Sequence, residues 1–161
     1  MLLIVEALLL SALFFLICYS QTGTDEKNMK SYRVYPDEIK KKLMKDEHLK
    51  DLIKPTSSSA IFVSNLVVFG IILFLFGIPL KHDNVHINVL NLLILGQWVN
   101  AFDYFVIDRM WWRHSTRPRF KDYPNPEWYQ DDTYHCQSFL RGIPLFCIIA
   151  IVDGILLTIF L

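Results

Sequence analysis

The chain has few charged residues, few cysteines and no excess of charge of either sign. Charged residues make up 20% of its 161 residues, against roughly 25% in soluble domains. The 16 basic and 16 acidic residues cancel, so no basic excess favours nucleic acid as a partner. Three cysteines are too few for the dense disulfide framework of a small secreted domain. With 53% hydrophobic residues, the composition argues against a water-soluble globular domain.

The sequence also lacks the motifs that name a reaction. Walker A, HExxH, GxSxG, GxGxxG and CxxC patterns are all absent. His82 and His86 are four residues apart, but they fall in a short turn without a third ligand, so no metal site is predicted. His114, His135 and Cys136 are another conceivable group, although about twenty residues of loop separate the histidines. Whether the protein is an enzyme, and which cofactor it uses, stay open.

Four apolar segments are present instead. A membrane-spanning helix needs about 20 predominantly apolar residues. The short alternating segments of a β-barrel are missing, so helices are the expected spanning structure. We therefore predict an all-α polytopic membrane protein, with residues 1–161 forming a single domain of four transmembrane helices. The predicted spans are 1–18, 60–80, 85–107 and 142–161.

The first segment resembles both a spanning helix and a secretory signal. A signal peptide begins with basic residues and ends in a small-residue cleavage site. Here no Lys or Arg precedes the apolar run, and Glu6 lies within it. An uncleaved first helix is the favoured interpretation.

The basic residues predict the orientation of the chain. Segment 19–59 holds nine Lys and Arg residues and segment 108–141 holds six, whereas the turn 81–84 holds one. Lys and Arg accumulate in cytoplasmic loops. We predict a multi-pass protein of the cell membrane with 19–59 and 108–141 in the cytoplasm and both termini on the opposite side.

A cytoplasmic amphipathic helix is predicted between the first and second spans. Pro36 and the acidic residues after it are typical of a helix start, and Pro55 would end the helix after about Ile53. Its apolar face would lie on the inner membrane surface, unless the helix is only a solvated charged segment.

Two carboxylates fall inside predicted spans, Glu6 and Asp153. A charged group at this depth is costly, and no Lys or Arg lies at a matching level. One interpretation is a hydrogen bond between helices, to Ser64, Asn65 or Thr158. The other is that these intramembrane carboxylates bind a proton or a cation.

The third span carries a polar stripe. At about 100° per residue its members fall within a sector of roughly 140°, which has to face other helices or a wet cleft. The stripe consists of Gln97, Asn100, Asp103, Tyr104 and Asp108.

Basic and tryptophan residues follow the stripe, as is typical of a membrane interface. The candidate catalytic residues are Asp103, Asp108, Arg109, His114 and Arg141. The candidate contacts to lipid headgroups are Trp111, Trp112, Arg113, Arg117 and Arg119.

Three functions fit these features. The favoured one is an accessory or structural subunit of a membrane complex, with a membrane-protein partner or a homo-oligomer in the lipid bilayer. The second is a membrane-embedded enzyme that acts on a lipid-like or phosphate-bearing substrate at the cytoplasmic interface. The third is an ion or proton pathway through Glu6 and Asp153.

Overall fold

The computed structural model describes residues 1–53 and 57–160, and within these ranges every regular element is a helix. Phe120 and Tyr123 form an isolated β-bridge. The elements are α1 (Leu2–Ser20), α2 (Asp25–Lys30), η1 (Tyr32–Val34), α3 (Asp37–Leu43), α4 (Glu47–Lys50), α5 (Ser58–Gly77), η2 (Ile78–Leu80), α6 (Val85–Phe102), η3 (Asp103–Trp112), η4 (Pro126–Tyr129) and α7 (Thr133–Phe160). The predicted all-helical fold class is confirmed.

Four stretches are long and apolar enough to cross a membrane: Leu2–Ser20, Ser58–Leu80, Val85–Trp112 and Pro126–Phe160. They coincide with the four predicted segments but differ in length. The third continues past residue 107, because the helix changes to π-winding at Asp103 rather than ending. The fourth helix already begins at Thr133, before the predicted start at residue 142.

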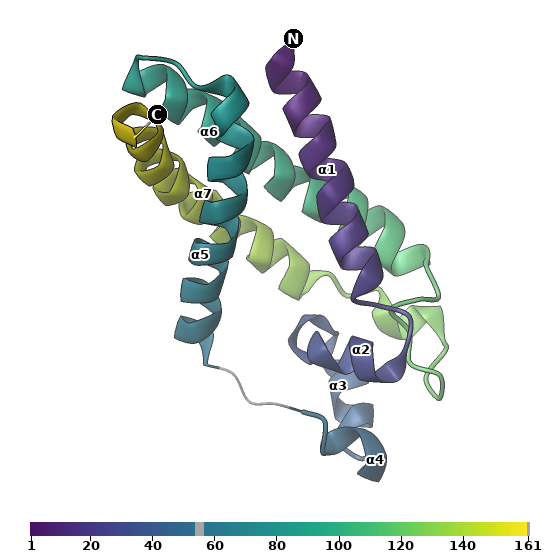
Figure 1. Ribbon diagram of the computed structural model, residues 1–161. Coiled ribbons are helices and arrows are strands. Elements are labelled where there is room, and N and C mark those ends of the chain that lie inside the picture. The colour runs from purple at the N-terminus through teal and green to yellow at the C-terminus, as the bar shows by residue number, and fades with distance from the viewer. Residues whose placement is uncertain (54–56, 161) are drawn as a thin grey trace. The chain divides into compact units, whose positions relative to one another are not determined.

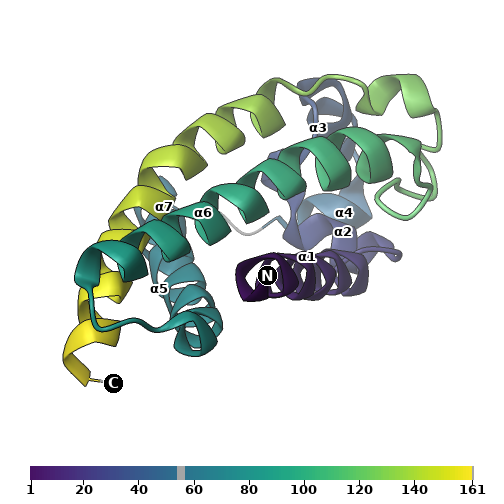
Figure 2. The same ribbon diagram turned by 90° about the horizontal axis from the view of Figure 1, so that it is seen from above.

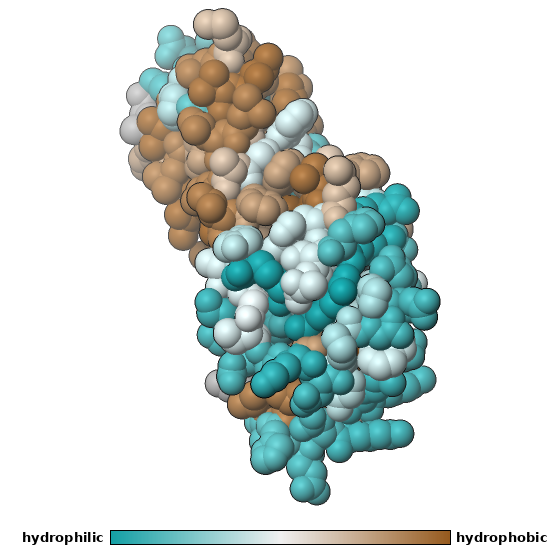
Figure 3. All heavy atoms as spheres, turned by 90° about the vertical axis from the view of Figure 1, so that its right-hand side faces the viewer, coloured by the Kyte–Doolittle hydropathy of each residue, from teal (hydrophilic) through white to brown (hydrophobic). Residues whose placement is uncertain are grey.

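The chain divides into two compact units. Unit 1 comprises residues 1–13, 56–102 and 139–161, and unit 2 comprises residues 14–55 and 103–138. The single-domain organisation expected from the sequence stays a prediction. On the face drawn in Figure 3, hydrophobic side chains gather over unit 1 and hydrophilic ones over unit 2.

Unit 1 is a bundle of apolar helices. The N-terminal end of α1, the turn between α5 and α6, and the C-terminal end of α7 lie at one end of it (Figure 1). Helices α6 and α7 run beside each other (Figure 2). Gly154 makes this approach possible, since a Cβ there would come within 2.9 Å of the Val89 backbone. Leu92 and Leu157 fill the core beside Gly77 of α5.

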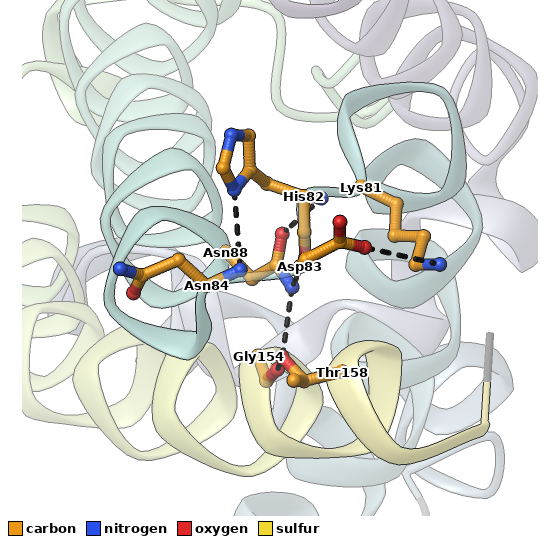
Figure 4. Close-up of polar contacts among 7 residues, drawn as sticks. All are labelled: Lys81, His82, Asp83, Asn84, Asn88, Gly154 and Thr158. Carbon is orange, nitrogen blue, oxygen red and sulfur yellow. Dashed lines mark hydrogen bonds and ion pairs between the residues drawn. The ribbon is translucent and has the colours of Figure 1, made fainter.

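A buried asparagine closes the turn between α5 and α6 (Figure 4). Asn88 donates to the His82 carbonyl at 2.7 Å and accepts from the His82 backbone N–H at 2.7 Å. Its amide also donates to the Thr158 hydroxyl of α7 at 2.8 Å. In the same turn the Asn84 backbone N–H donates to Nδ1 of His82 at 3.1 Å, and Lys81 and Asp83 make a weak contact of 3.9 Å. Asn88 therefore joins the turn, α6 and α7 at one buried point.

Part of the predicted polar stripe lies within unit 1, where it links helices. The Gln97 amide donates to the Ile143 carbonyl of α7 at 3.0 Å, and the Asn100 amide donates to the Phe139 carbonyl at 3.1 Å. The neighbouring Trp98 indole N–H donates to the Ser11 hydroxyl of α1 at 2.9 Å. These polar groups are bonded inside the unit.

Unit 2 has its own small core. Ile39 and Leu43 of α3 are fully buried against the rings of Trp112, Phe120 and Tyr129. The residues between 115 and 134, expected to form an irregular loop, thus supply packed aromatic rings and the short helix η4. The apolar face of α3 therefore packs against these aromatic rings.

The expected continuous helix over 36–53 consists of two short helices. Asp46 interrupts it by accepting hydrogen bonds from the backbone N–H groups of His48 and Leu49, which caps the start of α4. A single interfacial helix of the expected length is therefore replaced by α3, a turn and α4.

Tyr35 is a buried polar residue of this core. Its hydroxyl donates to the Pro118 carbonyl at 2.7 Å, and its side chain is 1% exposed. Burial raises the pKa of Tyr35 well above its usual range. The hydroxyl thus stays protonated and fastens the segment around Pro118 to η1 and α3.

Candidate acid–base site

The π-winding of η3 arranges the polar residues at the end of the third apolar stretch. Its hydrogen bonds join residues five apart, so side chains at that spacing come close to the same face. In an α-helix they would diverge by about 140°. One column accordingly contains Asp103 and Asp108, and the next contains Tyr104 and Arg109. Runs of π-helix are rare and often occur at functional sites, which draws attention to this segment.

Asp108 is paired with His135, in the first turn of α7. The carboxylate Oδ2 lies 2.9 Å from the imidazole Nδ1, and the side chains are 13% and 6% exposed. The other ring nitrogen, Nε2, is buried and has no hydrogen-bond partner among the described residues. The Trp112 ring packs against the imidazole with centroids 5.1 Å apart. Asp108 therefore orients the imidazole through Nδ1, and Nε2 is left without a hydrogen bond in the described part of the chain.

Asp132 contacts two arginines, Arg109 of the second column and Arg113 just after η3. Its Oδ2 lies 2.8 Å from the Arg113 guanidinium and 3.5 Å from Nε of Arg109. The Tyr104 hydroxyl donates to the same oxygen at 3.3 Å. Asp132 and His135 are three residues apart at the start of α7. His135 pairs with Asp108 of the first column, and Asp132 contacts Tyr104 and Arg109 of the second.

A carboxylate that accepts the Nδ1 proton of a histidine fixes the tautomer and leaves Nε2 as a base. This is the role of the carboxylate in hydrolase triads. Here Asp108 is placed to do the same for His135. The arrangement can remove a proton from a nucleophile and return it to a leaving group.

Further acidic and thiol groups lie near the pair. Asp103 has no hydrogen bond or ion pair in the described part of the chain, and it lies close enough to Asp108 for the two carboxylates to interact electrostatically. Cys18 interacts with both carboxylates in the same way. Among the described residues, no three His, Cys, Asp or Glu side chains are arranged to hold a metal ion.

A cavity of about 250 Å³ lies next to the first turn of α7. Tyr35, Lys40, Tyr134 and Gln137 are among its lining residues. The Tyr134 ring also packs edge-on against His135, with centroids 6.2 Å apart. Tyr134 is thus shared between the cavity wall and the environment of the imidazole.

The predicted headgroup contacts are engaged with protein. Trp112 is 6% exposed, and Trp111 packs against Phe15 with ring centroids 5.4 Å apart. The Arg117 guanidinium donates to the Thr22 carbonyl at 2.9 Å. Arg113 binds Asp132, as described above, and Arg119 donates to the carbonyl of Arg113 at 3.3 Å.

The other predicted site residues are scattered. His114 is exposed, and its Nδ1 lies 2.7 Å from the Met110 carbonyl one turn earlier. Arg141 lies in unit 1, as do Glu6 and Asp153, which are 9% and 6% exposed. Oδ2 of Asp153 is buried without a hydrogen-bond partner in the described ranges.

The sequence prediction missed the roles of Asp132 and His135. Their signal was present: two acidic residues precede a helix, and a histidine follows at a spacing that shares a helix face. Comparison with known proteins adds no relative, because no protein-family model, curated protein or solved structure matches the chain.

Proposed function

We propose that the protein is a membrane-embedded enzyme that uses Asp108 and His135 for acid–base chemistry on a lipid-like or phosphate-bearing substrate. The observation that carries this proposal is the 2.9 Å contact that orients the imidazole while its Nε2 stays without a partner. A buried histidine that served only the fold would normally use both nitrogens.

The reaction we propose is hydrolysis or transfer of an ester group. Nε2 removes a proton from water or a hydroxyl, whose oxygen then attacks the phosphorus or carbonyl carbon. The ester bond breaks, and the proton passes from Nε2 to the leaving oxygen. Asp108 stabilises the imidazolium formed between these steps. Since Nε2 is closed to solvent, a substrate reaches it after a side-chain movement, for which Tyr134 beside the cavity is best placed.

The proposal includes a place in the cell. The four apolar stretches would span the cell membrane, with the Lys- and Arg-rich segments 19–59 and 108–141 in the cytoplasm and both termini outside. The site would then lie at the cytoplasmic interface. There the half-exposed Arg109 can meet an anionic group, and α3 and α4 border the headgroups.

We infer less support for the accessory-subunit function, in which the polar stripe would pack against a partner, because Gln97 and Asn100 of that stripe are bonded to α7. The ion or proton pathway keeps one supporting observation, the buried and unpartnered Oδ2 of Asp153. Proton flux into vesicles that is lost in Asp153→Asn would favour that function over the enzyme.

The enzyme proposal is tested with the full chain in vesicles of phosphatidic acid, phosphatidylglycerol and phosphatidylethanolamine. Turnover is followed by ³¹P NMR and lipid mass spectrometry. We expect wild type to convert at least one lipid, and His135→Gln to be slower by about 10²–10⁴-fold. The matched control is His48→Gln, since His48 is an exposed histidine of α4. Conversion of none of these lipids by wild type, or equal rates for His135→Gln, would overturn the proposal.

A further inference from the structure

Beyond its first turn, helix α5 carries two polar side chains on its outside. Leu73 and Gly77 are its buried residues, and they lie in its second half. Ser64 and Asn65, in the first half, are exposed, and neither makes a side-chain hydrogen bond within the described part of the chain. The packing of α5 within unit 1 therefore provides, among the residues described, no hydrogen-bond partner for the Asn65 amide or the Ser64 hydroxyl.

The depth of Asn65 makes this exposure costly. Seven residues separate it from the start of α5 at Ser58, a rise of about 10 Å at 1.5 Å per residue. The whole stretch Ser58–Leu80 rises about 34 Å, slightly more than the roughly 30 Å of hydrocarbon. Asn65 thus falls inside the hydrocarbon, where an unbonded amide has no water to bind.

The surroundings of Asn65 form a face suited to another helix. Ser64, Val68, Ile71 and Leu75 are exposed and follow one another at intervals of four, three and four residues. This spacing places them along one side of the helix, and Asn65 flanks them. Small side chains such as Ser64 allow close approach of helices in lipid, where polar side chains add interhelical hydrogen bonds. We call these five residues the α5 outer face.

We propose that the α5 outer face is where a second copy of this chain binds. An asparagine amide has both donors and an acceptor, so two copies related by a two-fold axis can satisfy each other's Asn65. Two copies inserted in the same orientation automatically carry Asn65 at the same depth, provided that the axis is parallel to the membrane normal. This inference rests on the proposed membrane span of α5 and does not depend on the proposed enzymatic activity.

The association is measured in lipid vesicles by energy transfer between donor- and acceptor-labelled full-length chains. We expect wild type to form dimers and Asn65→Val to weaken them by about tenfold. Asn65→Gln should recover most of the affinity because it keeps the amide. The control is Val152→Ala, on the exposed side of α7, which should leave the affinity unchanged.

Cysteine cross-linking locates the contact. In a chain whose Cys18, Cys136 and Cys147 have been replaced by serine, Val68→Cys should form a disulfide between copies on oxidation, and Val152→Cys should not. A wild-type protein that stays monomeric, a dimer unchanged by Asn65→Val, or cross-linking confined to position 152 would each overturn the proposal. So would cross-linking of position 68 to a different membrane protein in native membranes.

Discussion

Gly154 of α7 lies directly against the backbone of Val89 of α6. A Cβ built on Gly154 would come within 2.9 Å of both N and Cα of Val89, closer than real Cβ atoms come to backbone. Neither backbone atom can turn aside as a flexible side chain could. The two helices are therefore packed at a distance that only glycine permits.

The first prediction follows from this contact. Gly154→Ala should lower the free energy of unfolding in detergent by about 1–3 kcal/mol, because α6 and α7 must separate to admit the methyl group. The matched control is Gly70→Ala in α5, where a Cβ meets nothing within 4 Å. That variant should be neutral or more stable by up to about 1 kcal/mol, since alanine is the better helix former. Equal effects of the two changes would contradict the proposed packing.

The second prediction concerns Asp108 and His135. Each alanine variant should lose about 1–3 kcal/mol of stability, since it leaves a largely buried polar partner unsatisfied. The double variant should cost less than the sum of the two, with an interaction energy of about 0.5–3 kcal/mol. The measurement is a double-mutant cycle of unfolding in detergent. Additive losses would mean that the two side chains do not interact.

The third prediction concerns Tyr35. Tyr35→Phe should lower stability by about 1–3 kcal/mol, because it leaves the buried Pro118 carbonyl without its donor. Tyr19→Phe, at an exposed tyrosine, is the control.

The same residue predicts a dependence on pH. The raised pKa of Tyr35 means that above about pH 10 the unfolded chain releases the phenol proton while the folded chain keeps it. The contribution to stability is complete below pH 10 and declines as the pH rises further. Wild type should therefore lose more stability than Tyr35→Phe between about pH 9 and pH 11. Parallel curves for the two proteins would contradict this assignment.

The fourth prediction concerns topology. A reporter that is active only in the cytoplasm should be silent when fused after Leu161. Inserted near Thr24 or Tyr129 it should be active, because both positions lie in the Lys- and Arg-rich segments. Activity at the C-terminus would reverse the proposed orientation.

The four long helices could be predicted because each depends on a local run of apolar residues, which the chain displays directly. The break in the helix over 36–53 was also encoded locally. Asp46-Glu47 is a typical helix start, and the capping bonds of Asp46 outweigh the periodicity on either side.

The site was less accessible to sequence reasoning. The polar stripe was placed with α-helical periodicity, which cannot anticipate a change to π-winding at Asp103. Trp112, the last residue of η3, packs in unit 2 with Ile39, Phe120 and Tyr129, which come from other parts of the sequence. The sequence analysis grouped His135 with His114 and Cys136, and only the folded chain brings His135 to Asp108.

The length of α7 ties the site to the thickness of the surrounding bilayer. Its 28 residues rise about 42 Å, whereas the hydrocarbon is about 30 Å thick. In the proposed orientation its first two turns, which contain His135 and follow directly on Asp132, extend into the headgroup region. A thicker bilayer would draw these turns towards the hydrocarbon, and a thinner one would expose them to water. Lipid chain length would then set the surroundings of the protein surface that covers the buried imidazole.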